Sequence, residues 1–249
     1  MTSTDEGLWF RRFAGAAGAD HRVVCFPHAG GSAPFFKPMA LALAPDVDVV
    51  AVQYPGRQDR RHEPPMDRIS DLADGISAAM DGILDRPLTF LGHSMGAVVA
   101  FEVARRLADD PRFRLVRLFA SGRPSPALSR PGRVHRLDDD GLVAEIESLG
   151  GTDTRLLREP EIRAMILPAV RADYRAVETY RFDAGKPLDS PITALIGTDD
   201  PHTTVAEAQD WATHTTAPCE LVEFPGGHFF VVDHASRIVD LVASRHGRA

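Results

Sequence analysis

Short apolar runs alternate along the chain with longer stretches in which apolar residues recur every three to four positions. Most of the short runs are continuously apolar, as expected for strands that are covered on both faces. Strands that alternate with helices in this way are typical of a mostly parallel sheet flanked by helices. The six expected strands are Arg22–Phe26, Val47–Gln53, Leu88–Leu91, Leu115–Ala120, Ile192–Ile196 and Cys219–Phe224.

Two stretches between these strands have the pattern of helices that pack on the sheet. From Ile69 to Ile83 the apolar residues fall on one face of a helix, which predicts an amphipathic element. Met95–Leu107 is apolar on nearly every side, and we therefore expect a helix that is buried against the sheet.

The alternation stops after the fourth strand, and about seventy residues follow without a convincing strand. Apolar spacing predicts one helix from about Asp138 to Leu149 and a second from Pro160 towards Tyr180. Proline suits the first turn of a helix, so Pro160 marks the start of the second one. Pro168 inside that helix is expected to kink it or to split it in two.

This segment is too long for a plain connection between strands. Ligands of open α/β sheets bind at the carboxyl ends of the strands. We therefore expect residues about 123–188 to form a helical lid there, inserted into a single domain that spans residues 1–249.

The pentapeptide Gly92–Gly96 matches the motif G-x-S-x-G and places Ser94 at its centre. The motif alone is weak, because glycine and serine are common. Here it follows an expected strand and opens an expected helix, which is the setting of a serine nucleophile in the α/β-hydrolase fold. The glycines allow a strained turn, and the helix N-terminus offers free amides to an oxyanion. The alternative, a glycine-rich loop that only starts a helix, fits this setting less well.

A serine nucleophile needs a base, and the chain has ten histidines. In this fold the triad runs in the order serine, acid, histidine, with the histidine after the last strand. His228 has that place, with helix capping as the alternative role, whereas His234 would fall inside the following helix. His93 is expected to point away from the nucleophile. His28 and His202 are weaker candidates, and the histidines expected to be solvated are His21, His62, His135, His214 and His246.

The acid of the triad has two usual places, after the strand before the lid and after the penultimate strand. The first place has no carboxylate before Asp138, whereas the second has Asp199 and Asp200. Asp200 is preferred because it ends the turn before Pro201, and Asp199 is the runner-up. A pair of helix-capping aspartates is the alternative.

An oxyanion hole needs two converging amides. We expect the N–H of Met95, which follows the nucleophile, and that of Ala29 in the glycine-rich segment Phe26–Ser32. This segment lacks the G-x-G-x-x-G spacing and the lysine of a P-loop, which argues against nucleotide binding. The expected chemistry requires no metal and no cofactor.

Composition and charge narrow the class of protein. The net charge is −7, from 35 acidic and 28 basic residues, which argues against a nucleic-acid-binding surface. The polar, acidic N-terminus is unlike a secretory signal, and no apolar run approaches the about 20 residues of a membrane helix. We expect a cytoplasmic monomer that binds no membrane, with Cys25 and Cys219 as free thiols in strands.

The chain also contains six longer motifs, namely Phe26–Ser32, Gln53–Arg57, Gly92–Ala97, Arg171–Tyr174, Gly197–Pro201 and Gly226–His228. They resemble the type II thioesterases of polyketide and nonribosomal peptide synthesis, and the resemblance covers nearly the whole chain. The resemblance implies a Ser94, Asp200 and His228 triad with the amides of Met95 and Ala29 as the oxyanion hole. It also implies the substrate, namely aberrant or stalled acyl groups on the phosphopantetheine arm of carrier proteins.

Three other functions could be built on the same fold. A general carboxylesterase or lipase would use the same triad, and only the longer motifs and the lid argue against it. A chain-terminating cyclase is disfavoured because the chain starts at Met1 and contains no carrier domain. A non-catalytic binding module of this fold would usually lack a triad member, whereas candidates for all three are present.

Two arginine-rich groups remain. We expect each to be a solvated surface, or one of them to lie at the site entrance and meet an acidic carrier or its phosphate. The first group is Arg123, Arg130, Arg133 and Arg136, and the second is Arg57, Arg60 and Arg61.

Overall fold

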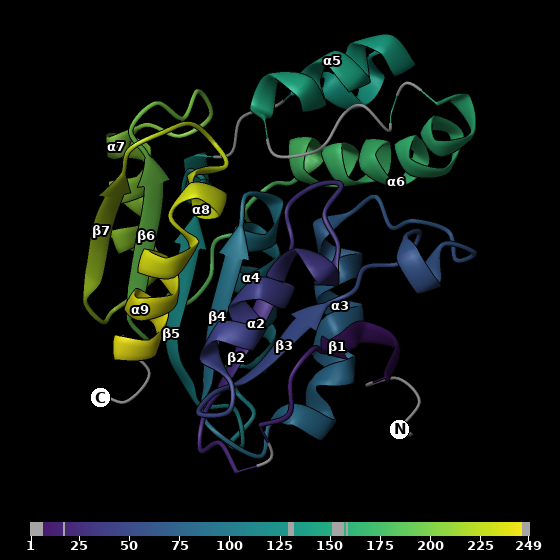
Figure 1. Cartoon of the computed structure of the whole chain (residues 1–249). Helices are drawn as coiled ribbons and strands as arrows, with labels where there is room; N and C mark the ends of the chain where they lie inside the picture. The colour runs from purple at the N-terminus through teal and green to yellow at the C-terminus, as the bar shows by residue number, and fades with distance from the viewer. Residues whose placement is uncertain (1–6, 17, 129–131, 151–156, 158, 246–249) are drawn as a thin grey trace.

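A computed structural model of the chain describes residues 7–16, 18–128, 132–150, 157 and 159–245. Its strands form one sheet in the order β1-β3-β2-β4-β5-β6-β7 (Figure 1). β1 pairs antiparallel with β3, and all the other neighbouring strands pair parallel. The strands are β1 (Phe10–Arg12), β2 (Arg22–Phe26), β3 (Asp48–Val52), β4 (Leu88–His93), β5 (Leu115–Ser121), β6 (Ile192–Gly197) and β7 (Cys219–Phe224).

The expectation of a mostly parallel sheet is confirmed, and all six expected strands are present. β1 was not expected, since three residues are too few to form a recognisable pattern. The continuous apolar runs are explained by two separate cores. Val24 and Phe26 of β2 pack into one core, and Val23 and Cys25 pack into the other, because successive side chains of a strand point to opposite faces.

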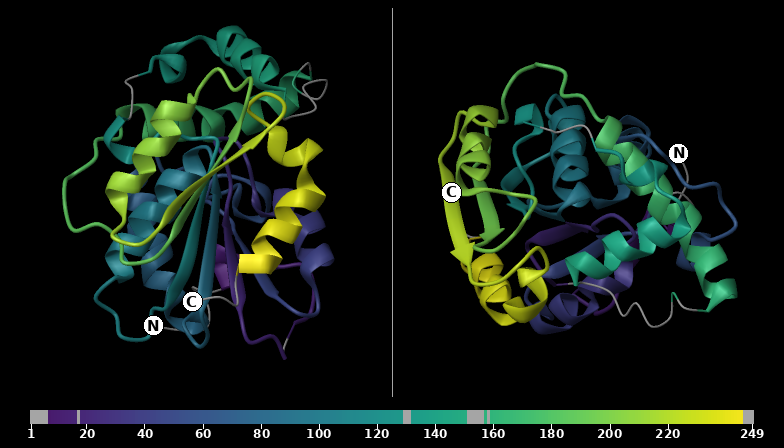
Figure 2. Two further views of the ribbon diagram at one scale, coloured as in Figure 1. Left: turned by 90° about the vertical axis from the view of Figure 1, so that its left-hand side faces the viewer. Right: turned by 90° about the horizontal axis from the view of Figure 1, so that it is seen from above.

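Helices cover both faces of the sheet (Figure 2). On one face lie α3 (Ile69–Ala79) and α4 (Met95–Leu107), and the latter is buried along almost its whole length as its composition predicts. On the other face lie α2 (Lys37–Leu43) and α9 (Ala235–Arg245). The shorter helices are α7 (Val205–Gln209), α8 (Phe230–Asp233) and the 3₁₀ helices η1 (Ala33–Phe36), η2 (Gln58–Arg60), η3 (Met80–Ile83), η4 (Pro126–Leu128), η5 (Val134–Arg136) and η7 (Asp210–His214).

Two helices lie above the carboxyl ends of the strands, α5 (Asp139–Leu149) and α6 (Pro160–Thr179) (Figure 1). They share a small apolar core of their own, which contains Leu142, Leu167 and Val170. The expectation that Pro168 splits the second helix is wrong, because α6 continues through it. Pro168 and Ala164 are both exposed, so water can bind the carbonyl oxygen that the missing N–H leaves free.

Cys25 lies on β2 and Cys219 on β7, and both are free thiols. Burial raises the pKa of the Cys25 thiol far above its ordinary value, whereas Cys219 is only half-buried. In the part of the chain that the structure describes, no helix combines the length and the apolar character needed to cross a bilayer.

Candidate active site

Ser94 lies on a sharp turn between β4 and α4. Its backbone has φ 55° and ψ −118°, a conformation that costs a residue other than glycine about 1–3 kcal/mol. The Ser94 amide donates to the Ser121 carbonyl, at 2.7 Å, which ties the turn to β5. A Cβ atom on Gly92 would lie 2.2 Å from the Gly96 carbonyl oxygen, and one on Gly96 would lie 2.0 Å from that of Phe26. Both glycines are therefore required, and together they hold the half-exposed Ser94 in place.

His228 and Asp200 form a buried pair after β7 and β6. His228 Nδ1 lies 2.9 Å from Asp200 Oδ2, and the side chains are 5% and 0% exposed. Asp200 Oδ1 also accepts the amide of His202, at 2.8 Å, so both of its oxygens have partners. This geometry fits a carboxylate that fixes the imidazole with Nδ1 protonated and Nε2 free to accept a proton.

Asp199 does not reach His228. It is exposed, and its side chain contacts the hydroxyl of Thr198, at 3.2 Å. Neither aspartate caps the next helix, since Thr204 caps α7 in a capping box with Glu207. The helix-capping alternative for the aspartate pair is therefore wrong.

The structure places the His228 ring against the turn that carries Ser94. The rings of His228 and His93, the neighbour of Ser94, have centroids 5.1 Å apart. A Cβ atom on Gly122 would lie 3.4 Å from His228 Cε1 and 2.8 Å from His93 Cε1. Since Gly122 follows Ser121, which holds the Ser94 amide, the three candidate residues converge at one edge of the sheet.

His93 and His28 lie buried beside His228. His93 Nδ1 lies 3.0 Å from Ser121 Oγ, and the His28 and His93 rings have centroids 5.9 Å apart. Burial, with a smaller effect of the nearby His228, lowers the pKa of His93 well below its ordinary value and that of His28 to about 3. Both rings therefore stay neutral near pH 7, and neither places a positive charge beside His228.

The expectation that five histidines are solvated is wrong for three of them. His21 and His214 are buried, and His135 is mostly covered and binds Glu178. Their loops pack on the core, which a local sequence pattern does not reveal. His62 is exposed as expected. His246 lies outside the described residues, and His234 contacts the Pro225 carbonyl, at 2.8 Å, from the end of α8 rather than from within a helix.

The segment Pro27–Gly31, named the oxyanion loop here, lies against the start of α4. The close approach of Gly96 to the Phe26 and Pro27 carbonyl oxygens brings the two segments together. Met95 is the first residue of α4, so its amide has no acceptor within the helix. Within the described residues, the amide of Ala29 in the oxyanion loop also has no hydrogen-bond partner. Both amides thus lack a hydrogen-bond partner in the described residues, as the two donors of an oxyanion hole require.

Side chains from other elements hold the oxyanion loop. The Tyr54 hydroxyl donates to the Pro27 carbonyl, at 3.1 Å, and Arg57 donates to the Gly31 carbonyl, at 3.2 Å. Arg57 also forms a bidentate pair with Asp173 of α6, at 2.5 and 2.8 Å. Burial works to lower the pKa of Arg57, but the adjacent carboxylate outweighs it and keeps that pKa above its ordinary value.

The expectation of a solvated or carrier-facing group at Arg57, Arg60 and Arg61 is therefore wrong for two of its members. Arg57 is buried with Asp173, a partner 116 positions away. Arg60 is buried, pairs with Glu63 and packs over the ring of Trp9. Of this group, only Arg61 is exposed.

The described members of the other arginine group also differ in exposure. Arg123 is half-buried, and burial lowers its pKa to about 10. Arg133 and Arg136 are exposed, and Arg130 lies outside the described residues.

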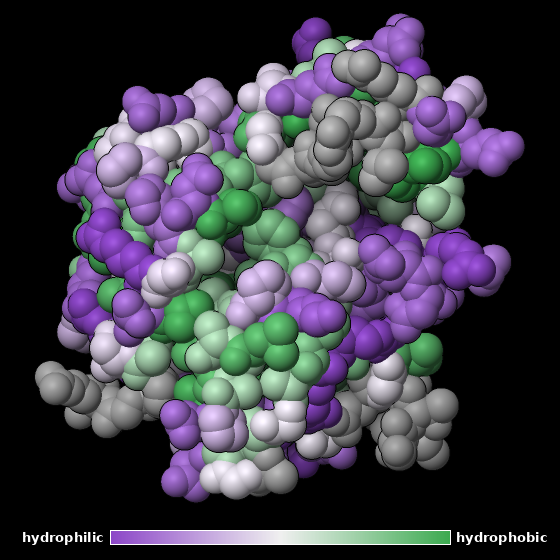
Figure 3. Space-filling view, viewed as in Figure 1, coloured by the Kyte–Doolittle hydropathy of each residue, from purple (hydrophilic) through white to green (hydrophobic). Residues whose placement is uncertain are grey.

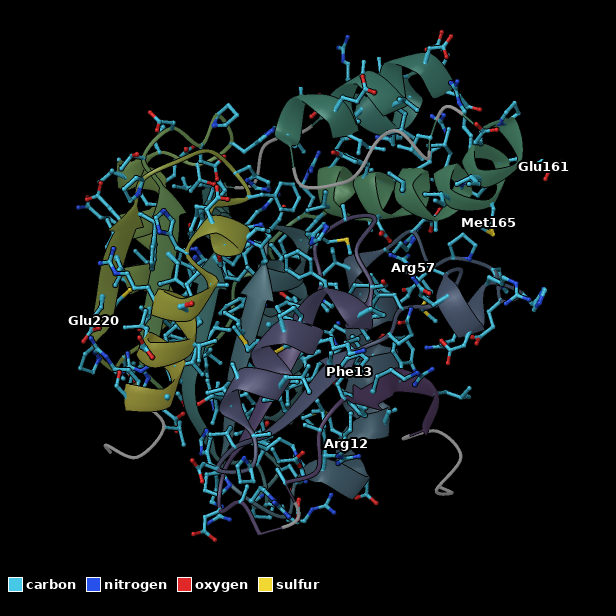
Figure 4. All side chains as sticks on the ribbon, viewed as in Figure 1. Arg12, Phe13, Arg57, Glu161, Met165 and Glu220 are labelled. Carbon is cyan, nitrogen blue, oxygen red and sulfur yellow. The ribbon has the colours of Figure 1, made fainter. Side chains whose placement is uncertain are left out.

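The cavities of the described residues include three near α5 and α6. One of about 590 Å³ lies between the oxyanion loop, Arg57 and the α6 residues Met165 and Val170. Arg57 and Met165 are labelled in Figure 4. The surface below α6, at the right of the view, is hydrophilic (Figure 3). Arg61, which also lines this cavity, is exposed. A smaller cavity of about 190 Å³ touches His228 and the end of α5. The third, of about 660 Å³ between α3, α4 and α6, contains none of the candidate catalytic residues.

Among the described residues, no three His, Cys, Asp or Glu side chains are arranged to hold a metal ion. The mostly parallel sheet and the serine at a strained strand–turn–helix junction define an α/β-hydrolase. Residues 21–245 match the family described as the thioesterase domain. The chain belongs to this thioesterase family and is a hydrolase.

Known relatives are similar over most of the chain. The probable cadicidin biosynthesis thioesterase of Streptomyces griseus is 48% identical over 243 residues, which are 96% of this chain and 66% of that protein. Thioesterase PikA5 of Streptomyces venezuelae is 44% identical over 93% of this chain and 83% of its own length. The solved type II thioesterase BorB from the borrelidin biosynthetic cluster has a TM-score of 0.90 and 45% identity, covering 96% of this chain and 97% of that one. The resemblance to type II thioesterases is confirmed.

Proposed function

We propose that the protein is a type II thioesterase that hydrolyses acyl groups from the phosphopantetheine thioester of carrier proteins in a polyketide or nonribosomal peptide pathway. The observation that carries the chemistry is the buried His228–Asp200 pair beside the strained turn of Ser94. The substrate class is supported by the biosynthetic thioesterases that the chain resembles, including BorB and PikA5. Removal of aberrant or stalled acyl groups is the role we assign to it in such a pathway.

The reaction proceeds in two steps of acyl transfer. Ser94 Oγ attacks the thioester carbonyl while His228 Nε2 takes its proton, and Asp200 stabilises the imidazolium. The amides of Met95 and Ala29 bind the oxyanion of the tetrahedral intermediate. The thiolate leaves readily, because a thiol has a pKa of about 8.5, and it takes the proton from the His228 imidazolium. The neutral His228 then takes a proton from a water molecule that attacks the acyl-Ser94 ester and returns it to Ser94 Oγ as the acid is released; no metal or cofactor takes part.

We infer that residues about 123–188 act as a lid within a single domain. Support for this comes from the position of α5 and α6 above the carboxyl ends of the strands, with an apolar core of their own (Figure 1).

The partners that we propose for the protein are acyl-loaded carrier proteins. We propose that it acts on them as a cytoplasmic monomer. The two free thiols, Cys25 and Cys219, suit a reducing compartment.

The substrate class is tested by comparing three propionyl substrates with the same acyl group. These are a propionyl-carrier protein, propionyl-N-acetylcysteamine and a simple propionyl ester. We expect kcat/KM to be highest for the carrier by about tenfold or more, which corresponds to about 1.4 kcal/mol of additional binding. The ester should be the poorest of the three. A clear preference for the simple ester would instead identify a general carboxylesterase.

A further inference from the structure

The oxyanion loop contains a tight turn at the residue that is to supply an amide. The Gly31 amide donates to the His28 carbonyl, at 2.9 Å, and Gly30 has φ 77°. These two features define a type II turn with Ala29 and Gly30 at its centre. The His28 carbonyl and the Ala29 N–H belong to one planar trans peptide, so they point in opposite directions. The hydrogen bond of the turn therefore sets the direction of the Ala29 N–H, and contacts from outside the loop set its position relative to Ser94.

The weak point of such a turn is its middle peptide, between Ala29 and Gly30. Type I and type II turns differ in the orientation of this peptide, so an unrestrained turn can rotate there. In this protein the Gly30 N–H donates to Asp173 Oδ2, at 2.7 Å. A carboxylate from α6 thus fixes the middle peptide from outside the loop.

Asp173 is itself fixed in place. Its side chain is fully buried, and its two oxygens accept the bidentate fork of Arg57 in addition to the Gly30 amide. Arg57 donates in turn to the Gly31 carbonyl, so the pair holds both sides of the turn. Gly30 also packs closely against α6. A Cβ atom on Gly30 would lie 3.1 Å from the side chain of Val170, which is on the same helix as Asp173. Arg57 lies directly below this helix in Figure 4.

We propose that Asp173 is a positioning residue that holds the Ala29 amide in the oxyanion hole, so that a helix of the lid completes the catalytic site of the core. The proposal rests on the proposed function, because it assigns the Ala29 amide to the thioester oxyanion. It assigns Arg57 and Asp173 to transition-state stabilisation rather than to the docking of a carrier.

The test is the double variant Arg57→Met/Asp173→Leu, which removes the Gly30 acceptor and leaves no buried unpaired charge. Three quantities are measured: kcat for propionyl-N-acetylcysteamine, the affinity of a trifluoromethyl ketone analogue that forms an oxyanion on Ser94, and the affinity of an unreactive thioether analogue. We expect kcat to fall by about 10²-fold, the size of the loss of one oxyanion donor. The ketone affinity should fall by a similar factor, and the thioether affinity should stay within about twofold.

The matched control is Asp67→Asn. It removes another ion pair between α6 and the core, from Arg175 Nη1 to Asp67 Oδ2 at 2.9 Å, whose side chains are 60% and 39% exposed. This variant should match the wild type in all three measurements. If the double variant does not fold, Arg57→Lys is measured instead. Lysine keeps the positive charge but cannot form the bidentate fork with Asp173, so kcat and ketone affinity should fall by smaller factors while thioether affinity stays unchanged.

The proposal is overturned if the variant that folds keeps wild-type kcat and ketone affinity, or if it loses ketone and thioether affinity equally. Failure of the proposed function is a separate outcome, because wild-type protein would then hydrolyse no thioester.

Discussion

Replacing Ser94 by alanine is expected to lower kcat for an acyl thioester by a factor on the order of 10⁴–10⁶, or about 5–8 kcal/mol of transition-state stabilisation. The change removes the oxygen that attacks the carbonyl and leaves the oxyanion amides in place. Alanine has the same Cβ as serine, so the strained φ of 55° costs both residues about the same. The fold and the thermal stability should therefore be retained. Steady-state hydrolysis of propionyl-N-acetylcysteamine measures the effect.

Ser70→Ala is a suitable control for this variant, because Ser70 is exposed and, among the residues that the structure describes, its hydroxyl donates only to the neighbouring Asp71. It should hydrolyse the thioester at the wild-type rate. Substantial residual turnover by a folded, pure Ser94→Ala protein would contradict the assignment of Ser94 as the nucleophile.

Replacing Asp200 by asparagine should lower kcat by about 10⁴-fold with little change in KM. The side chain keeps its shape and its place 2.9 Å from His228 Nδ1. The amide favours the wrong tautomer of the imidazole and no longer stabilises the imidazolium, so Nε2 cannot accept the serine proton. The loss is measured in the same thioester assay, together with the melting temperature of each variant.

Asp199→Asn is the matched control, since it makes the same chemical change one residue earlier in the chain. Asp199 is exposed, and within the described residues its side chain contacts only the Thr198 hydroxyl. Its amide donates to the Gly226 carbonyl, at 2.9 Å, and the substitution leaves that bond in place, so we expect wild-type turnover. A larger loss from Asp199→Asn than from Asp200→Asn would reverse the choice of acid.

The parallel sheet and the convergence of the candidate triad could be predicted because both follow from order along the chain. A serine after β4, an acid after β6 and a histidine after β7 all leave strands at the same edge of a parallel sheet. Pattern alone could not separate Asp199 from Asp200. The structure separates them, because only Asp200 turns into the buried space beside His228.

What the sequence did not reveal are contacts between segments far apart in the chain. Arg57 looked like part of a surface group because its partner, Asp173, lies 116 positions away on a helix of the lid segment. His214 looked solvated, yet it packs against the rings of Phe101 and Phe182. In each case local polarity favoured exposure, whereas tertiary packing supplied the carboxylate that pairs with Arg57 and the aromatic rings that cover His214.

The Gln53–Arg57 and Arg171–Tyr174 motifs were recognisable without a physical reason for their presence. The structure supplies one, since Tyr54, Arg57 and Asp173 all hold the oxyanion loop. The two motifs carry charges of opposite sign, Arg57 in one and Asp173 in the other. This is a signal that could have suggested an ion pair between them.

The most direct test of whether Ser94 is the nucleophile is covalent labelling of the protein. Wild-type protein is treated with an alkyl fluorophosphonate, which forms a stable ester with an activated serine, and is then studied by intact-mass spectrometry and peptide mapping. We expect one label per chain, on Ser94, and slow or absent labelling of Asp200→Asn. Labelling of a different residue, or equal labelling of wild type and Ser94→Ala, would contradict it.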